Sequence, residues 1–280
     1  MITLQTLENT SIDTILSTFN LAFSDYVVPM RITKEQLLHK INAENIRLDY
    51  SVGAFEDNEL IAFILHGYTI NNNKHLIYNG GTGVIPSKRG NKLTALLYDY
   101  LLPKLREKQI DSVTLEVITT NKPAIVTYEK TGFKTIRTLD CFKGTIQQKV
   151  MLGTADIQVM NSLDWKQLTA FWDWQPSWQN AAPAIEKSKT DLVSLGIYQN
   201  KELCGYLIFN PKSNRIQQFA IAKTHRNKGL AGQLIGFIAA NYTPEVSMIN
   251  IDSSSATTIA FLQNSGFQKT VSQYEMELKL

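Results

Sequence analysis

Residues 78–97 decide the fold and read YNGGTGVIPSKRGNKLTALL. The apolar, glycine-containing first part predicts a strand that ends near Ile85, followed by a basic loop with Lys88 and Arg89. Leucines spaced three and four residues apart then predict a helix from about Asn91. The first N–H groups of a helix lack intrahelical partners, so an anion such as a pyrophosphate could bind there. The alternative is an ordinary strand–loop–helix connection with solvated lysines.

The same pattern occurs a second time, in residues 215–234, which read RIQQFAIAKTHRNKGLAGQL. Here too an apolar strand precedes a basic loop that opens a helix. Arg89 and Arg226 lie 137 positions apart, close to half of the 280 residues. A repeat at this spacing indicates a duplicated domain.

The composition predicts a globular protein with one or two domains. Charged residues make up 19% and hydrophobic residues 44% of the chain, which excludes a disordered protein. A net charge of +3 is too small to indicate a nucleic-acid partner. No apolar run is long enough for a membrane span, and no signal peptide is evident. The widely spaced Cys141 and Cys204 do not form a metal motif and suggest buried thiols in a reducing, cytoplasmic compartment.

Two further motifs carry a family resemblance. The run Arg226-x-x-Gly229-x-Ala231 resembles the acetyl-CoA signature of the GCN5-related N-acetyltransferases (GNAT). Each half also has the later family element, a helix that ends in Gly-Phe, within residues 121–133 and 256–267. The resemblance covers nearly the whole chain, as two copies in tandem.

The resemblance implies an α/β (α+β) fold with two tandem GNAT-type domains. Each would have a mixed, mostly antiparallel central sheet flanked by helices. The expected domains are residues 1–147, which would be catalytic, and residues 148–280. A hairpin is expected at residues 56–59, where Glu-Asp-Asn-Glu joins two apolar runs.

For the first half, the resemblance implies a cofactor lying along the loop and the start of the helix. Glycines in the preceding strand would make a local distortion easy, since glycine tolerates unusual dihedral angles. The matching strand of the second half has no glycine. The residues expected to bind the cofactor are Val84, Ile85, Arg89, Gly90, Asn91, Lys92, Leu93 and Thr94, with Asn121 at the pantetheine arm.

The catalytic candidates of the first half are Tyr128, whose role the resemblance implies, and Glu116 on the expected central strand. Tyr128 would protonate the leaving thiolate, for which a phenol with a pKa of about 10 is suitable. Glu116 would take the proton of the amine, directly or through water. The alternatives are a tyrosine packed in the core and a strand glutamate that faces solvent. In the family the loop between the first two helices lines the acceptor pocket, so Asp25 and Tyr26 are substrate candidates; the alternative is a surface loop.

The first half departs from the signature at two positions. Lys92 stands where the first glycine belongs, and Thr94 stands where glycine or alanine belongs. The Thr94 hydroxyl could bind a phosphate. The Lys92 side chain must turn away, pair with the phosphates or block them.

The second half keeps the signature, so Arg226, Lys228, Gly229 and Ala231 are cofactor-binding candidates. It lacks the acid, because Leu262 stands where Tyr128 stands in the first half. We therefore expect the chemistry in the first half, with the opposite assignment as the alternative. An aromatic cluster is expected to pack in the core or between the halves, with a ligand cleft as the alternative: Phe171, Trp172, Trp174 and Trp178.

The leading hypothesis is an enzyme that transfers an acetyl group from acetyl-CoA to the amine of a small-molecule or peptide acceptor. The alternative is a non-catalytic sensor that binds an acyl-CoA. An ATP-binding module is disfavoured because no Gly-x-x-x-x-Gly-Lys-Ser/Thr run exists. No metal site is expected, and the acceptor and the oligomeric state are not predicted.

Overall fold

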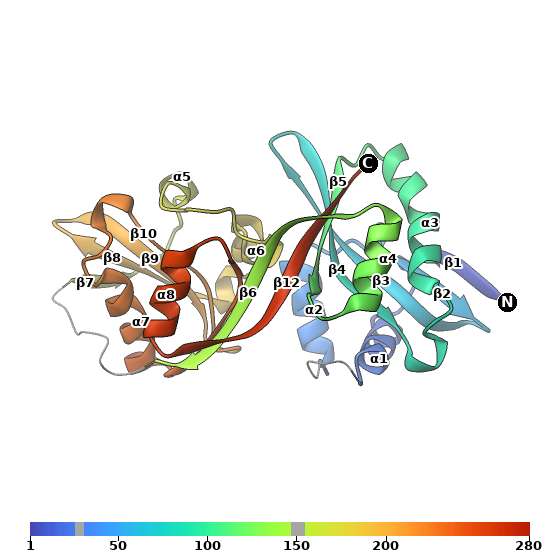
Figure 1. Cartoon of the computed structure of the whole chain (residues 1–280), viewed down its shortest axis with the longest axis horizontal. Helices are drawn as coiled ribbons and strands as arrows, with labels where there is room; N and C mark the ends of the chain where they lie inside the picture. The colour runs from blue at the N-terminus through green and yellow to red at the C-terminus, as the bar shows by residue number, and fades with distance from the viewer. Residues whose placement is uncertain (26–30, 147–154) are drawn as a thin grey trace. The chain divides into compact units, whose positions relative to one another are not determined.

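The computed structural model describes residues 1–25, 31–146 and 155–280 (Figure 1). It contains two compact units, one of residues Met1–Ile136 with Tyr274–Leu280 and one of residues Arg137–Gln273. The last seven residues of the chain thus belong to the first unit. The predicted boundary at residue 147 lies in the segment 147–154, outside the described residues, and stays a prediction.

The first unit is a sheet with two helices on each face (Figure 1). Its sheet has the order β1-β2-β3-β4-β5, followed by the end of β12. β4 and β5 pair in parallel. The pairs β1–β2, β2–β3 and β3–β4 are antiparallel. Its elements are β1 (Ile2–Thr6), α1 (Ile12–Ala22), α2 (Lys34–Ala43), β2 (Val52–Glu56), β3 (Glu59–Asn71), β4 (Lys74–Val84), η1 (Pro86–Lys88), α3 (Leu93–Glu107), β5 (Ser112–Ile118), α4 (Lys122–Thr131) and the start of β6 (Lys134–Thr145).

The second unit repeats this plan. Its sheet has the order β12-β6-β11-β10-β9-β8-β7, and β10 and β11 form its parallel pair. The elements are β7 (Asp156–Val159), α5 (Trp165–Thr169), η2 (Trp178–Asn180), α6 (Ala182–Ser188), η3 (Lys189–Asp191), β8 (Val193–Gln199), β9 (Glu202–Asn210), β10 (Arg215–Ile221), η4 (Lys223–His225), α7 (Leu230–Asn241), β11 (Glu245–Asp252), α8 (Ala256–Asn264) and β12 (Phe267–Lys279).

Local sequence explains the element ends. The Thr33 and Gln36 side chains form a capping box at the start of α2, and Gly132 ends α4 in a left-handed conformation. The predicted hairpin between β2 and β3 is confirmed, and its turn residues Asp57 and Asn58 both have positive φ. Two consecutive left-handed residues match the twist of the strands that they join.

Each unit has an apolar core on both faces of its sheet. In the first unit, α3 and α4 pack on one face around Leu97 and Tyr98, while α1 and α2 cover the other around Phe19 and Leu37. In the second unit, α7 and α8 cover one face and α5 and α6 the other. Cys141 and Cys204 are buried, as the sequence suggested.

The two parallel strands of each unit separate before they end. Pairing between β4 and β5 stops at Asn79 and Leu115, although both strands continue. Pairing between β10 and β11 is limited to Arg215 and Ser247. The separated strand ends leave backbone N–H and C=O groups that no longer bond to the parallel neighbour.

A β-bulge marks the separation in both units. Gly80 is the extra residue of β4, between the pairs Leu65–Gly81 and His66–Asn79. Gln217 is the extra residue of β10 and lies 137 positions after Gly80. The distortion predicted for the first half therefore also occurs in the second, without a glycine.

The strand glycines were expected to ease the distortion by adopting unusual dihedral angles, and this reason was wrong. Gly80, Gly81 and Gly83 are absent from the described residues with positive φ, so their backbones need no glycine-only dihedrals. Close packing is the reason at Gly83, where an added Cβ would lie 2.6 Å from the Phe63 ring.

Candidate functional site: a duplicated loop at the strand opening

The loops after β4 and β10 follow the same backbone path. Gly90 and Lys92 have φ of 81° and 55° in the first loop, and Asn227 and Gly229 have φ of 60° and 76° in the second. Each loop thus has two left-handed residues, one of which is a glycine. The glycine comes first in the first loop and second in the second loop. Lys92 and Gly229 are the N-cap residues of α3 and α7, and neither helix start has a side-chain cap among the described residues. The first-turn N–H groups therefore stay available to an anion.

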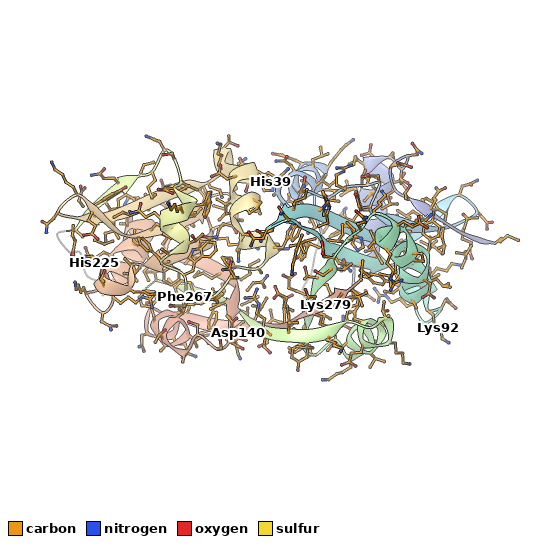
Figure 2. All side chains as sticks on the ribbon, turned by 90° about the horizontal axis from the view of Figure 1, so that it is seen from above. His39, Lys92, Asp140, His225, Phe267 and Lys279 are labelled. Atoms are coloured by element: carbon orange, nitrogen blue, oxygen red, sulfur yellow. The ribbon has the colours of Figure 1, made fainter. Side chains whose placement is uncertain are left out.

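Figure 2 labels Lys92 at the start of α3 and His225 in the matching loop. The Lys92 side chain is exposed. Its effect on phosphate binding stays a prediction. Lys88, the other lysine of the loop, pairs with Glu56 at the edge of the unit. The loop thus keeps the signature geometry although a lysine replaces the glycine.

The two signature arginines have equivalent partners in the two units: two backbone carbonyls and one aspartate each. Arg226 donates from Nε to the carbonyl of Ile221 (3.1 Å), from Nη2 to the carbonyl of Phe171 (3.0 Å) and from Nη1 to Asp173 (3.1 Å). One guanidinium thus ties the end of β10 to the segment that precedes α6.

Arg89 repeats this arrangement in the first unit. Its Nε, Nη2 and Nη1 donate to the carbonyls of Val84 (3.3 Å) and Ala22 (2.8 Å) and to Asp25 (2.8 Å). The hydrogen bond from Arg89 lowers the pKa of the Asp25 carboxyl. The structure thus brings together two residues that the sequence analysis assigned separately, to the cofactor and to the acceptor. Tyr26 lies outside the described residues.

The remaining predicted residues of the first loop differ in exposure. Leu93 is buried in the core, so only its backbone faces the loop, whereas Thr94 is half-buried in the first turn of α3. Asn91 is exposed and donates to the carbonyl of Lys88 at 3.0 Å. Val84 and Ile85 are half-buried at the end of β4.

A carboxyl group lies at the strand opening of the first unit. Glu116 directly follows Leu115, the last paired residue of β5, and Gly80 directly follows Asn79, the last paired residue of β4. The Tyr78 hydroxyl donates a hydrogen bond to the Glu116 carboxylate. Burial raises the pKa of Glu116 to about 8, and neighbouring Glu275 and Glu44 add to the rise while the bond from Tyr78 opposes it.

Glu44 brings a second carboxyl to this opening. It lies at the end of α2, is buried, and accepts two hydrogen bonds of 2.7 Å from Lys40. Its Oε2 would lie 2.6 Å from a Cβ added at Gly80. Glu44 therefore lies directly beside the bulge.

Tyr128 and Asn121 lie on α4. Tyr128 is buried, with its ring 6.3 Å from that of Tyr98 and 5.7 Å from that of Phe133. Asn121 caps the helix by accepting from the N–H of Ala124 at 3.3 Å. These contacts are structural, and the roles that the resemblance implies for Tyr128 and Asn121 stay predictions.

The second unit contains a cavity of about 250 Å³ beside its loop. Its walls come from β10 and β11, the start of α7, α8 and the segment from Phe171 to Asn180. Arg226, Gly229 and Ala231 line it, whereas Lys228 is exposed and is not among its lining residues. Phe171, Trp172 and Trp174 also line the cavity, and all three pack in or against the apolar cores of this unit. The expected core packing is thus confirmed for these three residues, and they also form part of a cavity wall.

Among the described residues of the second unit, no carboxyl has a pKa raised as that of Glu116 is. Asp252, at the end of β11, accepts from the Ser254 hydroxyl at 2.6 Å and from Arg137 at 3.4 Å. Burial alone would raise the pKa of Asp252, but the bonds from Ser254 and Arg137 lower it. Leu262, at the position of Tyr128, is fully buried in the core.

Some site residues have no signal in the sequence. Tyr78 and Glu44 meet near Gly80 only because β4, β5 and α2 adopt this arrangement. Asn180 and Tyr206, which line the second cavity, are 26 positions apart. Among the described residues, no cluster of three His, Cys, Asp or Glu could hold a metal ion. The described helices include none with the length and apolarity of a bilayer span.

Comparisons with known proteins agree with this arrangement. The model of the acetyltransferase (GNAT) family matches residues 15–133, and that of the acetyltransferase (GNAT) domain matches residues 164–278. The chain therefore belongs to the GNAT superfamily, with two such domains in tandem. The predicted fold class is thereby confirmed. GNAT proteins transfer acyl groups from acyl-CoA, which is the general activity that the fold supports.

Solved structures share the whole architecture at low sequence identity. A tandem GNAT protein from the clavulanic acid biosynthesis pathway is 9% identical with a TM-score of 0.74, over 100% of this chain and 98% of the other. A putative acetyltransferase from Pyrococcus horikoshii is 13% identical with a TM-score of 0.72, over 100% of this chain and 89% of the other. A GNAT from Sphaerobacter thermophilus is 13% identical with a TM-score of 0.71, over 99% and 95%. No curated protein matches the sequence.

Proposed function

We propose that this chain is a cytoplasmic N-acetyltransferase that uses acetyl-CoA and acts on the amine of a small molecule or peptide, with acyl transfer in the first unit. One observation carries the assignment to this unit. A carboxyl with a pKa raised to about 8, that of Glu116, lies where β4 and β5 separate. A general base works best when its pKa is near the working pH.

The residues of the first unit fit the parts of the reaction. Acetyl-CoA supplies the thioester acyl group. The uncapped N–H groups at the start of α3 would hold its phosphates, in the loop from Arg89 to Thr94. Glu116, as the carboxylate, would take the proton that the amine loses as its nitrogen bonds to the acyl carbon. Tyr128 would give its proton to the sulfur as the carbon–sulfur bond breaks.

The test is release of thiol from acetyl-CoA with a panel of amines. The wild-type rate should rise with pH through about 8, because Glu116 becomes the carboxylate above its pKa. The variant Glu116→Gln keeps the shape of the side chain but removes the base, and should be about a hundred-fold to ten-thousand-fold slower. Exposed Glu129→Gln on α4 is the control and should leave the rate unchanged. A Glu116→Gln enzyme as fast as wild type would remove Glu116 from the mechanism.

Tyr128→Phe tests the acid in the same assay. The substitution keeps the buried ring and its contacts with Tyr98 and Phe133. Turnover should fall about ten-fold to a thousand-fold, while affinity for coenzyme A stays nearly constant. An unchanged rate would mean that another group protonates the thiolate.

A second candidate places acyl-CoA in the second unit, and the cavity beside Gly229 favours it. Lys92 and Gly229 allow a matched test, since both are left-handed N-cap residues of equivalent helices. Asp and Asn tolerate this conformation similarly and differ in charge. The variants are Lys92→Asp and Lys92→Asn in the first unit, and Gly229→Asp and Gly229→Asn in the second. Calorimetry measures the affinity of each for coenzyme A. The unit that holds the phosphates is the one in which the Asp variant binds more weakly than the Asn variant, because the added negative charge repels them. Coenzyme A binding without turnover of any amine would instead favour the acyl-CoA sensor.

A further inference from the structure

Tyr78 places a hydroxyl beside Glu116 at the strand opening of the first unit. Tyr78 pairs with Thr114 in the parallel register of β4 and β5. Glu116 lies two residues beyond Thr114, so its side chain is on the same face of the sheet as that of Tyr78. The hydroxyl donates to Oε2 of the Glu116 carboxylate. This contact thus joins the two strands where their backbone pairing ends.

Burial leaves Tyr78 little surface for contact with a ligand. Tyr78 is 3% exposed, whereas Glu116 is half-buried. The ring lies beside the bulge, since a Cβ added at Gly80 would be 3.6 Å from Tyr78 Cε1. Tyr78 can therefore act on a reaction at the opening only through Glu116.

The hydrogen bond uses one of the two carboxylate oxygens. Among the described residues, none donates a hydrogen bond to Oε1 of Glu116. The bond at Oε2 restricts the rotation of the carboxylate, and Oε1 is then the oxygen that can receive a proton. Holding a catalytic group in one orientation is itself a contribution to rate.

The other charged groups around Glu116 come from α2 and β12. Burial raises the pKa of Glu116 most, and the Glu275 and Glu44 carboxyls add to that rise. The bond from Tyr78 and, to a smaller extent, the charge of Lys40 lower it. Burial and the charges of Glu116 and Glu44 raise the pKa of Tyr78 itself, so its hydroxyl keeps its proton and stays a donor. Of these groups, Tyr78 thus favours the carboxylate form of Glu116 most.

At the equivalent positions the second unit has neither member of this pair. Asn250 lies 134 positions after Glu116, the offset that also relates the two Gly-Phe motifs. Arg215 lies 137 positions after Tyr78, the offset of the two loops. An amide is not a base, and the Asn250 side chain donates to the Ser177 hydroxyl at 3.0 Å. The phenol and the carboxyl thus differ together between the units, as expected if one serves the other.

We propose that Tyr78 is a positioning residue for acyl transfer: its hydroxyl holds Oε2 of Glu116 so that Oε1 takes the proton of the amine. This rests on the proposed function, in which Glu116 is the base. A donor to a carboxylate favours the charged form over the neutral acid. Loss of the hydroxyl should therefore raise the pH at which Glu116 ionises and slow transfer at neutral pH, without weakening substrate binding.

The first measurement needs no substrate. A carbon-13 NMR titration of the full chain, labelled at the glutamate carboxyls, follows Glu116, whose signal is the one absent from Glu116→Gln. Its midpoint should lie near pH 8 in wild type, and about one pH unit higher in Tyr78→Phe, which keeps the ring. The control Tyr98→Phe removes another buried hydroxyl, one that accepts from Asn79 at 2.8 Å, and should leave the midpoint unchanged. An equal or lower midpoint in Tyr78→Phe would overturn the proposal.

The second measurement is thiol release from acetyl-CoA over the same pH range, with glycinamide, butylamine and spermidine as acceptors. Tyr78→Phe should lower kcat about ten-fold at pH 7, because the carboxylate fraction falls about ten-fold for each unit of pKa. The loss should shrink as the pH rises past about 9, and KM should stay constant. A loss that is equal at every pH would mean that Tyr78 only supports the fold. That result, or an unchanged kcat, would overturn the proposal.

The two measurements separate this proposal from the proposed function. A Glu116→Gln enzyme as fast as wild type would contradict the proposed function, and the role of Tyr78 in transfer with it. An unshifted titration beside a slow Glu116→Gln enzyme would overturn the role of Tyr78 alone. If none of the three amines is acetylated, the titration decides.

A thermal melt shows whether Tyr78→Phe folds. If it does not, 3-fluorotyrosine incorporated at all 11 tyrosines keeps each ring and makes each hydroxyl a stronger donor. The Glu116 midpoint should then fall below that of the unsubstituted protein. An unchanged midpoint would show that the Tyr78 hydroxyl does not hold the carboxylate.

Discussion

Lys92 and Gly229 adopt nearly the same left-handed backbone, with φ 55° and ψ 24° at Lys92 and φ 76° and ψ 1° at Gly229. The two residues lie 137 positions apart, as do the bulged residues Gly80 and Gln217 and the arginines of the two loops. The loop conformation has thus been kept in both units, although a glycine occupies this position in only one of them.

The first prediction exchanges these two residues. A residue with a side chain pays about 1–2 kcal/mol of strain in the left-handed region. Glycine avoids this strain but loses more conformational entropy on folding, which offsets part of the difference. Lys92→Gly should therefore raise the free energy of unfolding by about 0.5–1 kcal/mol, and Gly229→Lys should lower it by about 1 kcal/mol. No atom lies within 4 Å of a Cβ added at Gly229, so conformation alone is measured there. Urea unfolding curves give both values, and a loss of stability in Lys92→Gly would contradict this account.

The second prediction compares two glycines of β4. A Cβ at Gly83 would lie 2.6 Å from the Phe63 ring and 3.0 Å from the Ala22 Cβ, whereas at Gly81 the nearest atom is 3.8 Å away. Gly83→Ala should lower the free energy of unfolding by about 1–3 kcal/mol, as overpacking does. Gly81→Ala is the matched control and should change it by less than about 0.5 kcal/mol. Similar effects of the two substitutions would mean that packing is not why glycine is present at Gly83.

The third prediction concerns the guanidinium of Arg226. Two of its three contacts are with backbone carbonyls, which only a forked donor can reach together with a carboxylate. Arg226→Lys should lower the unfolding free energy by about 1–2 kcal/mol. Asp173→Asn, which removes only the charge of a partly exposed pair, should lower it by less than about 1 kcal/mol. Denaturation of both variants measures the difference, and the reverse order would assign the stabilisation to the ion pair.

The sequence predicted the features that depend on neighbouring residues. The strand, loop and helix around Arg89, their repeat around Arg226 and the hairpin at Asp57 follow from local patterns, and the structure confirms them. The family motifs are also local, which is why two tandem GNAT domains could be predicted from them.

Features that depend on distant residues could not be predicted. No glycine in the sequence indicates the bulge at Gln217, which arises from the pairing of β10 with β9. The bond from Tyr78 to Glu116 depends on the parallel register of β4 and β5, and a strand glutamate by itself does not reveal which face it occupies. The contacts of Arg89 and Arg226 with carbonyls of distant segments likewise depend on the fold and could not be read from the loop sequences.

The last prediction uses Glu116 to test the environment of the strand opening without a substrate. Its pKa is raised to about 8 in the folded protein, so the folded protein holds a proton that the unfolded chain releases near pH 4.5. The protonated group stabilises the fold fully below pH 4.5, and this stabilisation is lost as the pH rises to about 8. Glu116→Gln, which resembles the protonated form, should thus match wild type at pH 4.5. At pH 9 it should be more stable, by on the order of a few kcal/mol. Urea unfolding at both pH values measures this, with Glu129→Gln expected to show no such trend. A difference between Glu116→Gln and wild type that does not change with pH would show that the Glu116 carboxyl is hydrated, and would weaken its assignment as the base.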